Sequence, residues 1–256
     1  MALEIRRDGA LGELPRAVVF DTDNTLYPYE PAHRAALQAA EDKACTLLGV
    51  EATRFREAFA EARQAVKRQL GETASSHSRL LYYQRAIELL GMKSQLVMTL
   101  DLEQTYWRTF LAASALFPEV EDFLLDLRSA GIATAIITDL TSQIQFRKII
   151  YFGLDNCFDF VVTSEEAGVD KPAFAPFRLA LEKLQMAPAE TWMIGDDADA
   201  DIAGGRAIGM VTLQKRHDGV TVAAGQDGAD AVFDDFADLR HWLRQNADLV
   251  ANAETH

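Results

Sequence analysis

Short and nearly continuous apolar runs recur along this chain. The first occupies residues 17–20, and four more follow beyond residue 116, at residues 134–138, 160–163, 191–195 and 210–213. Runs of this length suit strands that are covered on both faces, as in a parallel sheet. Helical patterns lie between them, such as residues 120–128 before Gly131. We therefore predict an α/β fold, a doubly wound, Rossmann-like parallel sheet with helices on both faces.

Residues 28–115 carry a different pattern, with almost no strand signal. Apolar residues recur there at helical spacing in three stretches, and a fourth stretch follows. Gly49, Gly71 and Gly91 separate the stretches. This pattern predicts an all-α domain, a small helical bundle inserted after the first strand. The expected domains are a Rossmann-like core of residues 1–27 and 116–256 and a helical insert of residues 28–115.

Composition and charge narrow the classes of partner. The chain has 256 residues, of which 49% are hydrophobic, so it can build proper cores. Its formal net charge of −14 disfavours nucleic acid, although a bound metal would still admit an anionic small substrate. The two cysteines favour a reducing compartment, and we see neither a signal peptide nor an apolar run of about 20 residues that could span a membrane. We expect a cytoplasmic protein with no membrane partner.

Two carboxylates, Asp21 and Asp23, follow the first apolar run, in the segment Asp-Thr-Asp-Asn-Thr. Burying like charges together is costly unless a cation lies between them. We therefore interpret the pair as part of a divalent-metal site in which one carboxylate attacks the substrate and the other transfers a proton. A pair of solvated loop carboxylates is the alternative.

Polar groups also follow later runs, and ligands of open α/β sheets bind outside the carboxyl ends of the strands. Thr138 and Asp139 end one run, where a hydroxyl can hold a phosphoryl oxygen. A helix cap is the alternative role for Thr138. Lys171, just before Pro172, would neutralise the charge of a nucleophile and a phosphate; an isolated surface lysine is the alternative.

An acidic segment follows the run at residues 191–195. It contains Asp196 and Asp201, and Mg²⁺ prefers such oxygen ligands. A solvated acidic loop is the alternative, and a calcium loop would require a late bidentate Glu that is missing here.

Taken in order, these groups make the sequence similar to the haloacid dehalogenase (HAD) superfamily, in its phosphatase branch, over nearly the whole chain. The residues carrying this resemblance match the family's four motifs: Asp-x-Asp-x-Thr at Asp21–Thr25, the hydroxyl residue Thr138, Lys171 followed by Pro172, and Gly-Asp-x-x-x-x-Asp with Asp196 and Asp201. The helical insert resembles the family's smaller helical cap, which is thought to close over the site and choose the leaving group.

The resemblance implies a mechanism. Asp21 would be the nucleophile that forms an aspartyl-phosphate, and Asp23 would act as general acid and then as base. Mg²⁺ would be the cofactor, held by Asp21, the main-chain carbonyl of Asp23, and Asp196. Thr138 and Lys171 would bind the phosphoryl group, with Asp139 beside them. Asp201 would support the metal's waters or orient Lys171.

Asp23 distinguishes two branches of the family, because displacement of halide from carbon needs no proton donor. Its presence favours phosphoryl transfer to water. Asn24 replaces the Gly that is commoner at its position in the motif, and we expect no change in chemistry from it.

The expected function is Mg²⁺-dependent hydrolysis of a small phosphorylated metabolite. A phosphomutase or phosphotransferase on the same scaffold is the first alternative. The second is a catalytically inactive protein that binds a phosphorylated ligand. The sequence identifies neither the substrate nor the insert residues that select it. It also leaves the oligomeric state open, with a homodimer among the alternatives.

Overall fold

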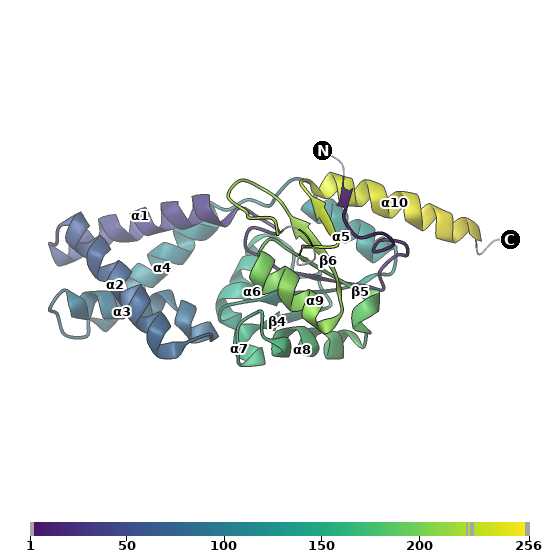
Figure 1. Cartoon of the computed structure of the whole chain (residues 1–256). Coiled ribbons are helices and arrows are strands. Elements are labelled where there is room, and N and C mark those ends of the chain that lie inside the picture. Colours follow the sequence, from purple (N-terminus) through teal and green to yellow (C-terminus); the bar gives the residue numbers. More distant parts are fainter. Residues whose placement is uncertain (1–2, 224, 226–227, 254–256) are drawn as a thin grey trace. The chain divides into compact units, whose positions relative to one another are not determined.

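A seven-stranded sheet organises the larger part of the chain in the computed structural model, which describes residues 3–223, 225 and 228–253 (Figure 1). The strand order is β1-β7-β6-β5-β2-β3-β4, and every neighbouring pair is parallel except β1 with β7. The strands are β1 (Glu4–Ile5), β2 (Ala17–Phe20), β3 (Ala133–Thr138), β4 (Phe160–Thr163), β5 (Thr191–Gly195), β6 (Val211–Lys215) and β7 (Ala231–Phe233).

The central strand β2 is buried along its whole length and pairs with β3 on one side and β5 on the other. In this register, Phe20 lies opposite both Ile136 and Ile194. The carboxyl ends of these three strands therefore meet at one edge of the sheet, where ligands of such sheets bind.

Helices cover both faces of the sheet. On one face, Val19 and Ile137 pack against Phe177 of α8. On the other, the ring of Phe20 lies 6.2 Å from that of Phe123 on α5. The helices of this unit are α5 (Val120–Ser129), α6 (Ser142–Tyr151), α7 (Ser164–Ala167), α8 (Phe174–Leu184), α9 (Gly204–Ile208) and α10 (Phe236–Ala253), with the short turns η2 (Pro188–Glu190) and η3 (Ala198–Ala203). The α/β fold class predicted from the sequence is confirmed.

The chain divides into two compact units, one of Met1–Tyr27 with Leu116–His256 and one of Pro28–Ala115. The second unit is helical (Figure 1). Its aromatic core is centred on Tyr106, which packs against Trp107 and Phe110. Its elements are α1 (Tyr29–Leu48), α2 (Ala52–Leu70), η1 (Ala74–His77), α3 (Arg79–Leu89) and α4 (Leu96–Ala112).

None of the helices in the described part of the chain combines the length and the apolar character needed to cross a lipid bilayer.

Candidate active site

Asp21 extends the central strand β2 by one residue at the carboxyl-terminal edge of the sheet. Its main-chain N–H donates to the carbonyl of Ile194 at 2.9 Å, so the pairing with β5 continues to this position. The side chain is buried, and the hydroxyl of Thr25 donates to its Oδ2 at 3.1 Å. The intervening loop turns at Asn24, whose φ of 61° is left-handed. Asn tolerates this conformation better than most residues, which explains how it can replace Gly there.

Lys171 joins two carboxylates. Its Nζ lies 2.6 Å from Oδ1 of Asp21 and 2.6 Å from Oδ1 of Asp201, and it also donates to the carbonyl of Ile137 at 3.2 Å. The residue does not directly follow a strand, because α7 and a loop separate it from β4. Asp139 anchors that loop by accepting a hydrogen bond from the main-chain N–H of Lys171 at 3.0 Å.

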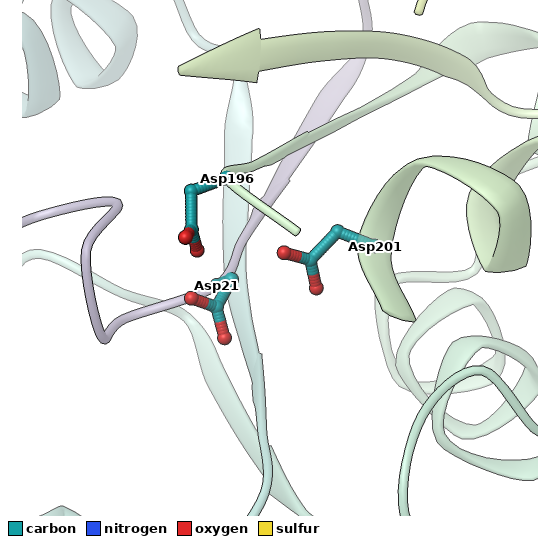
Figure 2. Close-up of side chains that lie close together, drawn as sticks. All are labelled: Asp21, Asp196 and Asp201. Carbon is teal, nitrogen blue, oxygen red and sulfur yellow. The ribbon is translucent and has the colours of Figure 1, made fainter. Parts of the chain in front are cut away.

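Asp196 and Asp201 bring two more carboxyl groups to the same place. Figure 2 shows the three acids converging from the end of β2, the end of β5 and the helical turn η3. One oxygen atom from each of Asp21, Asp196 and Asp201 lies within 4.8 Å of the others. Gly195 permits this approach, because a Cβ atom at that position would collide with the carboxyl group of Asp201.

The neighbouring acid Asp197 has a local structural task. Its carboxylate accepts from the N–H groups of Asp199 and Ala200 at 2.9 and 2.8 Å and so caps η3. Its own N–H donates to Oδ2 of Asp201 at 3.1 Å, which fixes the second oxygen of that carboxylate.

The acids are crowded enough to resist ionisation. Burial, followed by repulsion from neighbouring acids, raises the pKa of Asp21 to about 7 and that of Asp196 to about 8. Burial also raises the pKa of Asp201, against the opposing effect of Lys171. For Lys171 burial alone would lower the pKa, but the surrounding acids outweigh it and raise the pKa.

The cluster thus has three carboxyl groups but one ammonium group, which contacts Asp21 and Asp201. A further cation would relieve the excess negative charge, and the donors available are the hard oxygen ligands that Mg²⁺ prefers. The chemistry of these donors therefore fits the metal that the resemblance implies.

Thr138 is the last residue of β3, and its buried hydroxyl group lies beside the loop that follows Asp21. Its Oγ1 lies 2.9 Å from Oγ1 of Thr22 and accepts from Nε2 of Gln145 at 2.8 Å. Gln145 also donates to the main-chain carbonyl of Asp139 at 2.9 Å. The hydroxyl of Thr138 is therefore held by Thr22 of the first motif and by Gln145 of α6.

Asp23 has its own set of partners, separate from the cluster around Lys171. The ammonium group of Lys148 lies 2.8 and 3.2 Å from its two carboxylate oxygens, and the hydroxyl of Tyr27 donates to Oδ1. Neither Lys148 nor Gln145 was predicted from the sequence. Their spacing of three places them on one face of α6, but nothing in the local pattern marks that polar face as buried.

Comparison with known proteins identifies the family to which the chain belongs. The model of the haloacid dehalogenase-like hydrolase family matches residues 15–209, more than half of the chain. The chain therefore belongs to the haloacid dehalogenase-like hydrolases, as the four motifs indicated.

Individual relatives narrow the chemistry. A ribulose-1,5-bisphosphate 5-phosphatase of Halopiger xanaduensis is 41% identical over 198 residues, which is 77% of this chain and 83% of that protein. A glyceraldehyde 3-phosphate phosphatase of Methanopyrus kandleri is 31% identical over 205 residues, 78% of this chain and 84% of that protein. Together with the family, these relatives support a phosphatase on a HAD scaffold, a hydrolase that acts on phosphate esters.

Solved structures agree on the fold. The crystal structure of a HAD phosphatase from Thermococcus onnurineus matches 89% of this chain and 97% of its own, with a TM-score of 0.68 and 25% identity. A 2-haloacid dehalogenase from Pseudomonas syringae matches 91% of this chain and 99% of its own, with a TM-score of 0.70 at 23% identity. The second likeness concerns the fold alone.

Proposed function

We propose that this protein is a Mg²⁺-dependent phosphatase that hydrolyses a small phosphorylated metabolite through an aspartyl-phosphate on Asp21. The observation that carries the proposal is the position of Asp21. Its buried carboxylate at the end of β2 is held at Oδ1 by Lys171 and lies beside Asp196 and Asp201. A nucleophile needs this combination of fixed orientation and adjacent positive charge to attack an anionic phosphate.

Mg²⁺ would be held by the side chains of Asp21 and Asp196 and by the main-chain carbonyl of Asp23. When bound, the ion supplies charge that neutralises the phosphate and the attacking carboxylate. Asp201 would orient Lys171, because the ammonium group of Lys171 already occupies its Oδ1 and the main-chain N–H of Asp197 its Oδ2.

The chain's own residues would then carry two displacements. Asp21 attacks phosphorus while the bond to the leaving oxygen breaks, and Asp23 gives its proton to that oxygen. In the second displacement a water attacks the phosphoryl group, Asp23 takes its proton, and the carboxylate of Asp21 is released. Lys171 and Thr138 would hold the phosphoryl oxygens throughout, with Asp139 fixing the loop that carries Lys171.

The relatives point to the substrate class. Two of them are named as phosphatases of phosphorylated sugars, ribulose-1,5-bisphosphate and glyceraldehyde 3-phosphate. We therefore propose a sugar phosphate as the substrate here. The helical unit Pro28–Ala115 would serve as the cap that selects it. Both cysteines, Cys45 and Cys157, are free thiols, which suits a cytoplasmic enzyme.

The test is the release of inorganic phosphate from a panel of sugar phosphates, with Mg²⁺ and with EDTA. Asp21→Asn should abolish turnover, whereas Asp199→Asn changes an exposed acid of the same segment and should not. Phosphate release that survives EDTA or persists in Asp21→Asn would refute the proposal. Transfer of phosphate to a second sugar without release would favour the phosphotransferase alternative.

A further inference from the structure

Helix α6 buries two polar side chains where an ordinary helix would bury apolar ones. Gln145 is 0% exposed and Lys148 is 2% exposed, while Ile144 and Ile149 of the same helix are also buried. Removing an ammonium group from water costs several kcal/mol unless a charged partner compensates it. Gln145 and Lys148 lie three positions apart and so share one face of the helix. Gln145 uses that face to hold Thr138, so the face adjoins the candidate active site.

The partner of Lys148 is Asp23. The ammonium group lies within hydrogen-bond distance of both carboxylate oxygens, at 2.8 and 3.2 Å, and it sits 5.8 Å from the centre of the Tyr27 ring. The hydroxyl of Tyr27 donates to Oδ1 of the same carboxylate. Asp23 is thus held by two side chains, although 35% of its own side chain is exposed.

The site therefore assigns a separate ammonium group to each acid of the first motif. Lys171 contacts Asp21 and Asp201, whereas Lys148 contacts Asp23. Solvent alone could stabilise the charge of Asp23, because 35% of its side chain is exposed. A two-point contact from a buried helix face, in contrast, fixes where the carboxylate points.

We infer that Lys148 is a positioning residue for Asp23, acting with Tyr27, and that it sets how well Asp23 protonates the leaving oxygen. This inference rests on the proposed function. In the step concerned, Asp21 forms its bond to phosphorus, the bond from phosphorus to the ester oxygen breaks, and the proton of Asp23 goes to that oxygen. The negative charge left on Asp23 then lies directly against the ammonium group of Lys148.

This role has a chemical signature that a purely structural role lacks. An alcohol leaves as a poorly stabilised anion unless it is protonated, whereas p-nitrophenolate leaves readily without a proton. Loss of a well-placed acid should therefore slow alkyl esters more than aryl esters. The relevant constant is kcat/KM, because it reports the steps up to and including formation of the aspartyl-phosphate. It does not include the later hydrolysis of that intermediate, which is the same for both esters.

The experiment compares benzyl phosphate with p-nitrophenyl phosphate, two esters of similar size, in the full-length enzyme with Mg²⁺. In Lys148→Met, the ratio of kcat/KM for the benzyl ester to that for the nitrophenyl ester should fall by about tenfold or more. Lys148→Arg, which keeps a cation, should retain most of the ratio. Tyr27→Phe removes a single oxygen and should lower the ratio in the same direction by less.

Lys215→Met is the matched control, since Lys215 is also buried but its ammonium group donates to the main-chain carbonyls of Arg216 and Asp234. Its ratio should equal that of the unmodified enzyme. An equal loss on both esters in Lys148→Met and Tyr27→Phe would overturn the inference. If Lys148→Met fails to fold, Tyr27→Phe decides alone, and an unchanged ratio there would overturn it. Failure of the unmodified enzyme to release phosphate from either ester and from every sugar phosphate of the panel would instead refute the proposed function.

Discussion

The Nζ atom of Lys171 lies 2.6 Å from Oδ1 of Asp201, a carboxylate that is almost wholly buried on the turn η3. The same Nζ lies equally close to Asp21, so one ammonium group serves two acids from distant parts of the chain. Asp196 adds a third carboxyl group to this cluster. The cluster is therefore short of positive charge, and stability and activity should depend on the same few groups.

Replacement of Lys171 by Met should lower both the stability and the activity of the protein. It leaves Asp21 and Asp201 buried without their ammonium partner, which should lower the free energy of unfolding by about 3–5 kcal/mol. Turnover should fall on the order of 100-fold or more through lost stabilisation of the transferring phosphoryl group. Urea-induced unfolding and steady-state kinetics measure the two effects.

Lys183→Met is the control for this change, because its ion pair with Glu166 is partly exposed. Loss of that pair should cost at most about 1 kcal/mol and leave activity intact. Equal destabilisation by the two substitutions would show that the buried cluster has no special part in stability.

The metal-free protein should lose stability as pH rises from about 5 to about 8. The pKa of Asp21 is raised to about 7 and that of Asp196 to about 8, so the native state keeps protons that the unfolded chain has already released above 3.8. Because the native state binds more protons in this window, raising the pH favours unfolding. Denaturant unfolding at several pH values in EDTA measures the slope.

Mg²⁺ should reverse this trend by replacing the protons, and its stabilising effect should grow with pH. A metal-free stability that rises with pH across the same window would contradict the arrangement of the three acids, as would an effect of Mg²⁺ that does not depend on pH.

Gly195→Ala should displace Asp201, because the added Cβ would collide with its carboxyl group. Lys171 would lose one partner, and we expect a stability loss of about 1–3 kcal/mol together with a marked fall in kcat. Gly205→Ala is the control, since the atoms nearest to a Cβ there belong to the side chains of Met193 and Thr212. It should lower the melting temperature without a comparable fall in kcat; a larger kcat loss in Gly205→Ala would argue against this view of Gly195.

Thr138→Val should weaken inhibition by inorganic phosphate about tenfold, because one hydrogen bond to a charged oxygen is lost while the shape of the side chain is kept. Thr134→Val is the matched control on the same strand, as its hydroxyl donates to the carbonyl of Cys157 at 2.9 Å. It should affect stability alone. If the inhibition constants of both variants equal that of the unmodified enzyme, Thr138 does not hold the phosphoryl group.

The parallel sheet was predictable because its central strands are continuous apolar runs. The register then brings the ends of β2, β3 and β5 together, so Asp21, Thr138 and Asp196 could be expected to converge from sequence alone. In contrast, β1 and β7 escaped prediction, since strands of two and three residues carry too little pattern.

The support of the site was harder to foresee. Lys148 and Gln145 look like solvated positions of an amphipathic helix, because sequence alone does not reveal that a polar helix face is buried against polar partners. The position of Lys171 depends on a loop held by Asp139, and the approach of Asp201 depends on the absence of a side chain at Gly195. Such contacts arise between distant segments and leave no local periodicity.

Trapping of the phosphorylated enzyme tests the central claim most directly. The enzyme would be mixed with substrate and Mg²⁺, quenched during turnover, reduced with borohydride and digested for peptide mass spectrometry. We predict reduction of the acyl phosphate at position 21, to homoserine, in the unmodified enzyme and in Asp199→Asn, and no such product in the absence of substrate. Rapid phosphate release with an unmodified Asp21, or with the modification on another acid, would contradict the account.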